Sequence, residues 1–392
     1  MNSYVYGLLD LSFWQYALVS FSLFMVSMMS ITLYLHRDQA HRAIDLHPAL
    51  RHFFRFWIWF NMAMHTDQWV AVHRKHHAMC ERDGDPHSPQ VFGLTKVLLE
   101  GAELYQVEAA KPDVVEKYSR GTPRDAMQHF YWRFNNWGIV MMILVSIILF
   151  GAPGIIILGV QLIASPLFAA GIINGLAHHS GYRNFESDDA STNLTPLAVL
   201  IGGEELHNNH HAFPTSAKFS VRWWEFDIGW MYICIFRALG LCKVRRVAPK
   251  PNVIQSRQVD LETLQAVLVN RMHVMREYTQ NVTLPVLKTE RLAAHGNAML
   301  ARARKLMVVR PEKLDETARQ RLAKVLEDNQ SLKKVHEFRE QLVQIWEEAN
   351  VSNERLVEQL KAWCAEAESS GIRSLEEFSE RLRGYMLQPV GA

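Results

Sequence analysis

Residues 11–41 read LSFWQYALVSFSLFMVSMMSITLYLHRDQAH, an apolar run that ends in two histidines. The 25 residues from Leu11 to Leu35 contain no charged side chain. As a helix they extend about 37 Å, which is enough to cross a bilayer. Residues 1–11 carry no Lys or Arg and the run is long, so we expect a membrane span rather than a cleaved signal peptide.

Two further segments extend this membrane pattern. The 46 residues from Trp137 to Tyr182 also lack charge, which predicts two crossings with a turn at Gly151–Gly154. The segment Phe53–Val72 contains Arg55 and Asp67 and is rich in aromatic residues, which suits a helix lying in the membrane interface. The sequence therefore predicts an all-α fold, an integral-membrane helical bundle of about three spans plus an interfacial helix.

Charge divides the chain into two parts. Residues 255–392 hold 41 of the 82 Lys, Arg, Asp and Glu residues, so we expect a membrane domain over 1–254 and a charged, helical, cytoplasmic region over 255–392. No chemical motif marks that region, and we expect solvated helices without a separate activity. The alternatives are packing on the cytoplasmic face of the membrane domain, dimerisation, and recruitment of the electron donor. The net charge of +2 gives no reason to expect nucleic acid.

Basic residues predict the orientation. They follow both long apolar runs, as Arg37, Arg42, Arg51 and Arg55 after the first and Arg237, Lys243, Arg245, Arg246 and Lys250 after the second. The positive-inside rule places both regions in the cytoplasm and the N-terminus outside.

The four cysteines suggest no metal site of their own. Cys80, Cys234, Cys242 and Cys364 form no CxxC pair, which argues against a zinc ribbon or an iron–sulfur cluster. We expect them to be separate, reduced thiols.

Half of the 18 histidines fall into four short motifs, which we call the boxes. They are HRDQAH with His36 and His41, HRKHH with His73, His76 and His77, NGLAH with Asn174 and His178, and HNNHH with His207, His210 and His211.

Spacing explains why such boxes bind metal. Residues at i, i+3 and i+4 share one face of a helix, so each HxxHH box presents three imidazoles together. In HxxxxH the two rings lie about 140° apart on an α-helix. That first box must therefore lie where the helix ends or bends, or its two rings serve different metals.

The number of histidines points to two metals. Four ligands is the usual limit for zinc, and nine imidazoles exceed it. Imidazole suits iron, copper, zinc and nickel, so ligand type does not choose among them. We expect ordinary polar roles for His47, His52, His65, His129 and His179, and leave His87 open.

The boxes must share one side of the membrane to build one centre. The first box follows the first span, and the second stays on that side only if Phe53–Val72 lies in the interface. The hairpin then crosses out and back, which brings Asn174, His178 and the last box to the cytoplasmic face. Three crossings and one interfacial helix thus satisfy both charge and metal geometry.

The box set resembles the three histidine boxes of the membrane fatty acid desaturases, and most closely the stearoyl-CoA (Δ9) type. The similarity extends to Asp85-Pro86-His87 after the second box, to NGLAHHSGY at 174–182 and to Gly203-Glu204-Glu205-Leu206 before the last. It covers roughly residues 12–250, and bacterial members with a similar tail are the closest in character.

The resemblance implies a cytoplasmic di-iron cap held by the nine box histidines, with Asn174 acting through a water and with no catalytic residue beyond the metal ligands. It suggests one iron on a subset such as His36, His41, His76 and His211, and the other on His73, His77, His178, His207 and His210. The HxxxxH spacing of the first box favours a desaturase over a hydroxylase with HxxxH.

The resemblance also implies the reaction and its partners. We expect O₂-dependent insertion of a cis double bond, at Δ9, into a long acyl chain on CoA or phospholipid. The chain lacks a GxGxxG loop and a fused cytochrome b5 signature, so electrons come from a ferredoxin-like protein or its reductase. We also expect a bacterial inner membrane as the setting. A di-iron fatty acid or alkane hydroxylase is the alternative, and a His-rich metal transporter is a third possibility that the position of the boxes at span ends disfavours.

Overall fold

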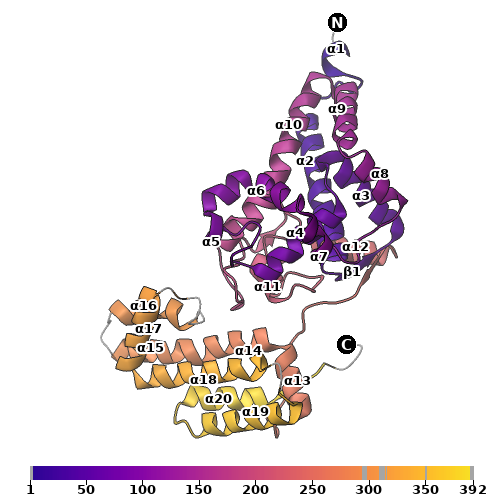
Figure 1. The fold of residues 1–392 in the computed structure, drawn as a ribbon. Coiled ribbons are helices and arrows are strands. Elements are labelled where there is room, and N and C mark those ends of the chain that lie inside the picture. The colour runs from indigo at the N-terminus through magenta and orange to yellow at the C-terminus, as the bar shows by residue number, and fades with distance from the viewer. Residues whose placement is uncertain (1–2, 294–297, 309–313, 315, 349–350, 389–392) are drawn as a thin grey trace. The chain divides into compact units, whose positions relative to one another are not determined.

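The computed structural model describes every residue except 1–2, 294–297, 309–313, 315, 349–350 and 389–392. The chain forms two compact units, Met1–Ala248 and Pro249–Ala392. Most of the described residues are helical (Figure 1). The strands form three two-stranded pairs. The predicted all-α fold is confirmed.

The first apolar run forms one long helix. It starts as α2 (Phe13–Met29) and continues as the π-helical η1 (Ser30–Ala40), after a short α1 (Ser3–Tyr6). Its 28 residues, Phe13–Ala40, are long and apolar enough to cross a membrane. The π-helical part lies in the buried core of the first unit, where Leu33, Tyr34 and Leu35 are fully buried.

The second apolar run forms the predicted hairpin. Helix α9 (Trp137–Phe150) turns at Gly151 into α10 (Ala152–Pro166), which continues through η2 (Leu167–Ile172) to His178. Gly151 has a φ of +61°, and a Cβ there would lie 2.2 Å from the Val5 carbonyl oxygen, so the turn requires glycine.

The number of membrane spans depends on two helices that meet at a sharp bend. The helix Ala152–His178 is long and apolar enough to cross a membrane, as the first helix is. Helices α8 (Ala126–Arg133) and α9 meet at a bend of 73°, and they form a third crossing only if both belong to one span. The described residues therefore contain two or three candidate spans.

The expected single interfacial helix over Phe53–Val72 is wrong in its extent. The segment belongs to two helices, α3 (Pro48–Met62) and α4 (Thr66–Met79), separated at Ala63, which has a φ of +49°. Helix α3 is amphipathic, with Phe54 and Ile58 buried and Phe53 exposed. The left-handed residue ends α3, so that α4 can carry its histidines in a new direction.

Short elements complete the first unit. They are α5 (Pro89–Phe92), α6 (Leu94–Ala109), α7 (Pro112–Tyr118), the 3₁₀ turn η3 (Leu176–His178), α11 (His207–Ala212) and α12 (Ile228–Ala238). Strand β1 (Ile44–Leu46) pairs antiparallel with β4 (Cys242–Val244), and β2 (Leu197–Ala198) pairs parallel with β3 (Phe226–Asp227). The first pair joins segments that are far apart in sequence, and the second pair brackets the segment that contains the last box.

The second unit is a separate helical bundle. Its helices are α13 (Leu261–Val269), α14 (Arg271–Tyr278), η4 (Thr279–Thr283), α15 (Leu284–Ala293), α16 (Ala298–Val308), α17 (Glu316–Asp328), α18 (Gln330–Glu347), α19 (Asn353–Glu368) and α20 (Arg373–Arg383). The strands β5 (Asn252–Val253) and β6 (Tyr385–Met386) pair near its ends. Leu264, Tyr278, Phe338, Leu342 and Trp363 share one buried core.

Candidate metal centre

The nine box histidines converge into two groups of donor nitrogens. The first, the five-histidine group, contains His36, His41, His73, His77 and His210. The second, the four-histidine group, contains His76, His178, His207 and His211. Within each group the donor atoms lie within 4.8 Å of one another.

Each HxxHH box contributes to both groups. In α4, His73 and His77 are one turn apart and face the five-histidine group, while His76 faces the other. In α11 the arrangement is reversed, because His207 and His211 face the four-histidine group and His210 the five-histidine group. The two helices thus bridge two adjacent metal positions, rather than each presenting one cluster of three.

The π-helical geometry of η1 resolves the spacing of the first box. His41 donates its backbone N–H to the His36 carbonyl at 3.0 Å, a bond between residues i and i+5. In such wide turns residues five apart lie above one another. The two rings are 4.9 Å apart and both join the five-histidine group, so the alternative in which they serve different metals is wrong.

The nitrogen separations fit a metal-binding shell. The Nε2 atoms of His36 and His210 are 3.0 Å apart, those of His77 and His210 2.9 Å, and those of His178 and His207 3.0 Å. Two imidazole nitrogens about 2.1 Å from one metal, at right angles, lie about 3.0 Å apart. Convergence of several uncharged nitrogen lone pairs at this spacing has no packing advantage without a cation among them.

Four carboxylates hold the outer nitrogens of these rings. The Nδ1 atom of His36 faces Glu204 at 2.8 Å, and that of His76 faces Asp85 at 3.0 Å. His178 pairs in the same way with Glu81 at 3.2 Å, and His211 pairs with Asp189 at 2.8 Å. Such carboxylate–histidine pairs leave Nε2 as the ligand atom and raise its basicity.

These carboxylates were missed as functional residues in the sequence. Asp85 and Glu204 were noted only as parts of the family-like surroundings of two boxes, and Glu81 and Asp189 not at all. The only available signal was their closeness in sequence to a box, which Glu81, Asp85 and Glu204 have and Asp189 lacks.

Burial disfavours the charged form of five box histidines. It lowers the pKa of His41, His73, His77, His207 and His210 well below the usual value, and the neighbouring imidazoles lower it further. The free lone pairs are therefore available to a metal at neutral pH.

The pKa values of two of these carboxyl groups are lowered, which favours their charged form. Burial alone would raise the pKa of Asp85 and Asp189, but the charges of, and hydrogen bonds from, His76 and His211 outweigh it and lower both. The outer shell is thus anionic, and it compensates the charge that two cations would bring.

The expected division of ligands between the two metals is corrected by this geometry. His76 and His211 lie with His178 and His207, not with His36 and His41. Asn174 lies on the last span one turn before His178 and lines the adjoining cavity. Its role through a water stays a prediction.

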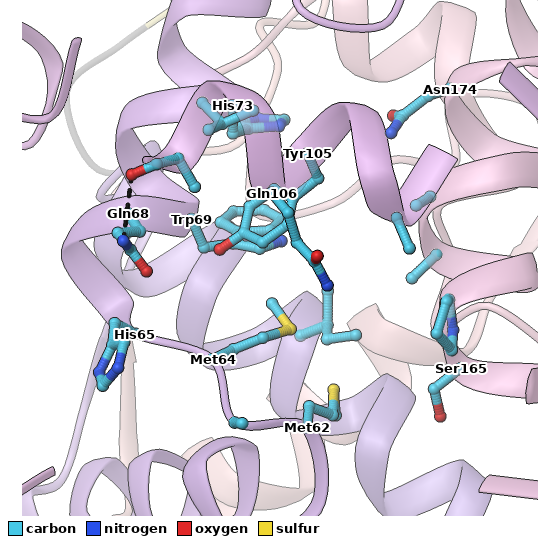
Figure 2. Close-up of a pocket in the computed structure, with 18 of the residues that line it drawn as sticks. Met62, Met64, His65, Gln68, Trp69, His73, Tyr105, Gln106, Ser165 and Asn174 are labelled. Carbon is cyan, nitrogen blue, oxygen red and sulfur yellow. Dashed lines mark hydrogen bonds between the residues drawn. The ribbon is translucent and has the colours of Figure 1, made fainter. Parts of the chain in front are cut away.

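A cavity of about 660 Å³ reaches both groups. His36 and His73 of one group and His76 and His207 of the other lie in its wall, and Figure 2 shows the side chains that line it, Trp69 among them. The Trp69 ring stacks on His73 at 4.9 Å with an interplanar angle of 11°.

One face of the last span forms a wall of this cavity. The lining residues recur at helical spacing, as Gln161, Ser165, Ala169, Ile173 and Asn174. The cavity therefore extends from the histidines along the span into the apolar part of the first unit.

Three further histidines that the structure describes, His65, His87 and His129, join neither group. His65 stacks on Trp132 at 4.0 Å and bonds Asn135, and the exposed His129 bonds the Asp125 carbonyl. His87 is buried 4.5 Å from the His76 ring and lines the cavity, without joining either group.

The comparisons identify the class of the first unit. The fatty acid desaturase family model matches residues 12–231. The chain is 31% identical over 234 residues to Delta-9 acyl-lipid desaturase 1 of Arabidopsis thaliana, covering 58% of this chain and 74% of the relative. It is 30% identical over 263 residues to the Acyl-CoA C20 Delta5-desaturase of Anemone leveillei, covering 64% and 78%.

A second family model, described as a transposase, matches residues 263–388 within the second unit. It covers less than half of the chain, and we draw no activity from it. Because the desaturase model spans more than half of the chain and its relatives are matched over most of their length, the resemblance is confirmed. The bacterial character stays a prediction, since the relatives named here are plant proteins. The chain belongs to the fatty acid desaturase family and is a fatty acyl desaturase.

Proposed function

We propose that this enzyme uses two irons and O₂ to introduce a cis double bond, at Δ9, into a long saturated acyl chain. The observation that carries the proposal is the pair of five- and four-histidine groups in the wall of one elongated cavity. When bound there, two irons supply the O₂-activating redox chemistry that desaturation requires. The reaction balances as one CH₂–CH₂ unit, O₂, two electrons and two protons giving CH=CH and two waters.

The protein's own contribution is orientation. The rings of four box histidines present Nε2 inward, because Glu204, Asp85, Glu81 and Asp189 hold their outer nitrogens. Trp69 is held against His73, where it restricts how an acyl chain passes the histidines. Fixing one pair of methylenes near the metals sets both the position and the cis geometry of the double bond.

The acyl carrier, the electron donor and the membrane setting complete the proposal. The acyl chain enters on CoA or on phospholipid; the relatives' names include both an acyl-lipid and an acyl-CoA desaturase. An external ferredoxin-like protein or its reductase supplies the electrons. We place the enzyme in the bacterial inner membrane with three crossings, the N-terminus outside, and the histidines and second unit in the cytoplasm.

Lipid analysis of cells that express the chain tests the proposal. We expect cis-monounsaturated chains that appear only with O₂ and disappear in His77→Ala and His210→Ala, while His129→Ala, which removes an exposed histidine outside both groups, retains activity. A hydroxylated product would instead support the hydroxylase alternative. Unchanged lipids from a well-expressed, iron-loaded protein would refute both.

A further inference from the structure

An apolar surface brings together residues from before and after the last histidine box. Leu197, Leu200, Trp223, Trp224 and Phe226 are all exposed, and we call them the Trp223 patch. The β2–β3 pairing places Leu197 opposite Phe226, and Phe226 donates its N–H to the Pro196 carbonyl at 2.8 Å. Trp223 is 95% exposed, the highest value among the large apolar side chains that the structure describes.

The patch continues onto α12. Met231, Ile235 and Leu239 are exposed at four-residue spacing, which puts them on one side of that helix. The opposite side is buried through Ile233, and Phe236 contacts Phe54 of α3 with ring centroids 6.5 Å apart. Helix α12 is therefore amphipathic and lies against α3, which has exposed aromatic residues of its own.

Contacts to the first span give the depth of this surface. The Thr32 hydroxyl donates to the Gly202 carbonyl at 3.0 Å. A Cβ on Gly202 would lie 2.6 Å from the Thr32 methyl carbon and 3.3 Å from the Met28 carbonyl oxygen. These contacts lie one to two turns before His36, about 6–12 Å toward the membrane interior at the usual helical rise.

We infer that the Trp223 patch and the exposed side of α12 insert into the interfacial zone of the bilayer, as an anchor separate from α3. Loop 197–202 packs through Gly202 on the buried side of the first span at this depth, so its exposed side chains Leu197 and Leu200 lie level with the cytoplasmic end of that span. Tryptophan favours this zone because its ring is apolar while its N–H remains within reach of head groups. The sequence had placed everything after the last span in the cytoplasm.

The anchor has a consequence for the centre. The chain that leaves the patch continues through Glu204, which bonds His36, into the box that starts at His207. Holding this loop in the membrane interface therefore holds the last box against the first. The inference rests on the membrane crossing and not on the identity of the metal.

Tryptophan quenching in the full-length protein, reconstituted in phosphatidylcholine bilayers, tests the inference. Subtracting the Trp223→Phe signal from the wild type isolates the emission of Trp223. We expect bilayers of brominated phosphatidylcholine to quench this component several-fold more than aqueous iodide does. Trp363→Phe is the matched control, because Trp363 is 3% exposed in the core of the second unit. Its component should respond to neither quencher.

Two outcomes would overturn the inference. Quenching of Trp223 by iodide and not by brominated lipid would place the patch in water. Protection from both quenchers would mean that protein covers it, either a second copy or another partner. If Trp223→Phe does not fold, Trp224→Phe gives the same comparison at the neighbouring position, and unchanged iron content of either variant shows that the centre is intact.

Discussion

At the residue scale, the hydrogen bonds behind the histidines decide which ring nitrogen can bind metal. Asp189 accepts from Nδ1 of His211 at 2.8 Å and is itself fixed by the N–H of Ser191 at 3.0 Å. The charge of His211 and its hydrogen bond lower the pKa of Asp189 despite burial. Asp189 therefore remains an anion that orients a ligand of the four-histidine group.

Asp189→Asn should weaken iron binding about 10- to 100-fold, the usual cost of losing such a partner. The amide keeps the shape of the side chain, but it removes the charge and orients the ring less strongly. Competition with a chelator measures the affinity. Asp83→Asn is the matched control, because it removes the same charge at an exposed position shortly after the second box. Equal iron affinity in both variants would remove Asp189 from the centre.

Sequence spacing identified the nine histidines because most of their grouping is local. His73 and His77, or His207 and His211, share a face on any helix. Their carboxylate partners could not be identified in this way. Glu204 reaches His36 across 168 residues and Glu81 reaches His178 across 97, so only the folded chain reveals the pairs. For the same reason, the sequence could not show that His76 and His211 belong to a different group from His36.

At the element scale, the last span packs on α6 through a residue that has no side chain. A Cβ on Gly171 of η2 would lie 2.5 Å from the Leu98 carbonyl oxygen. The close approach of the two backbones sets the wall of the cavity between them, because Tyr105 of α6 and Asn174 of the span both line it.

Gly171→Ala should therefore destabilise the protein, by about 1–3 kcal/mol as overpacked sites do. Gly159→Ala is the control on α10, where a Cβ would meet nothing within 4 Å. It should leave stability unchanged or raise it by up to about 1 kcal/mol, because alanine favours helix. Thermal unfolding in detergent compares the two, and equal midpoints would contradict the close packing.

The elements themselves were only partly predictable. Glycine and proline at 151–154 predicted the hairpin turn correctly, because they disfavour continued helix. The break at Ala63 was missed, since alanine gives no sign of a left-handed conformation. The π-helix at Ser30–Ala40 was missed as well, because its wide turns are stabilised by tertiary contacts such as Thr32 with Gly202 and Glu204.

At the scale of the whole molecule, the second unit has the means to fold by itself. Its core joins helices from Leu264 to Leu382, and two aromatic side chains in that core form hydrogen bonds within the unit. Tyr278 donates to the Val335 carbonyl at 2.6 Å and Trp363 to that of Phe338 at 2.9 Å. These are properties of an independent domain.

Residues 249–392 expressed alone should therefore be helical and unfold cooperatively. Circular dichroism with temperature measures both properties. Trp363→Ala should lower the midpoint sharply, since it empties a large buried volume, at a cost of about 3–5 kcal/mol. A non-cooperative transition in the unaltered fragment would show that the unit depends on the rest of the chain.

Metal analysis of the purified full-length protein tests the central claim most directly. The account predicts two irons per chain. It also predicts that His41→Ala, in the five-histidine group, and His178→Ala, in the four-histidine group, each lower the content toward one, because each variant damages a different group. Zinc in place of iron, a single metal, or the same loss from His129→Ala would contradict it.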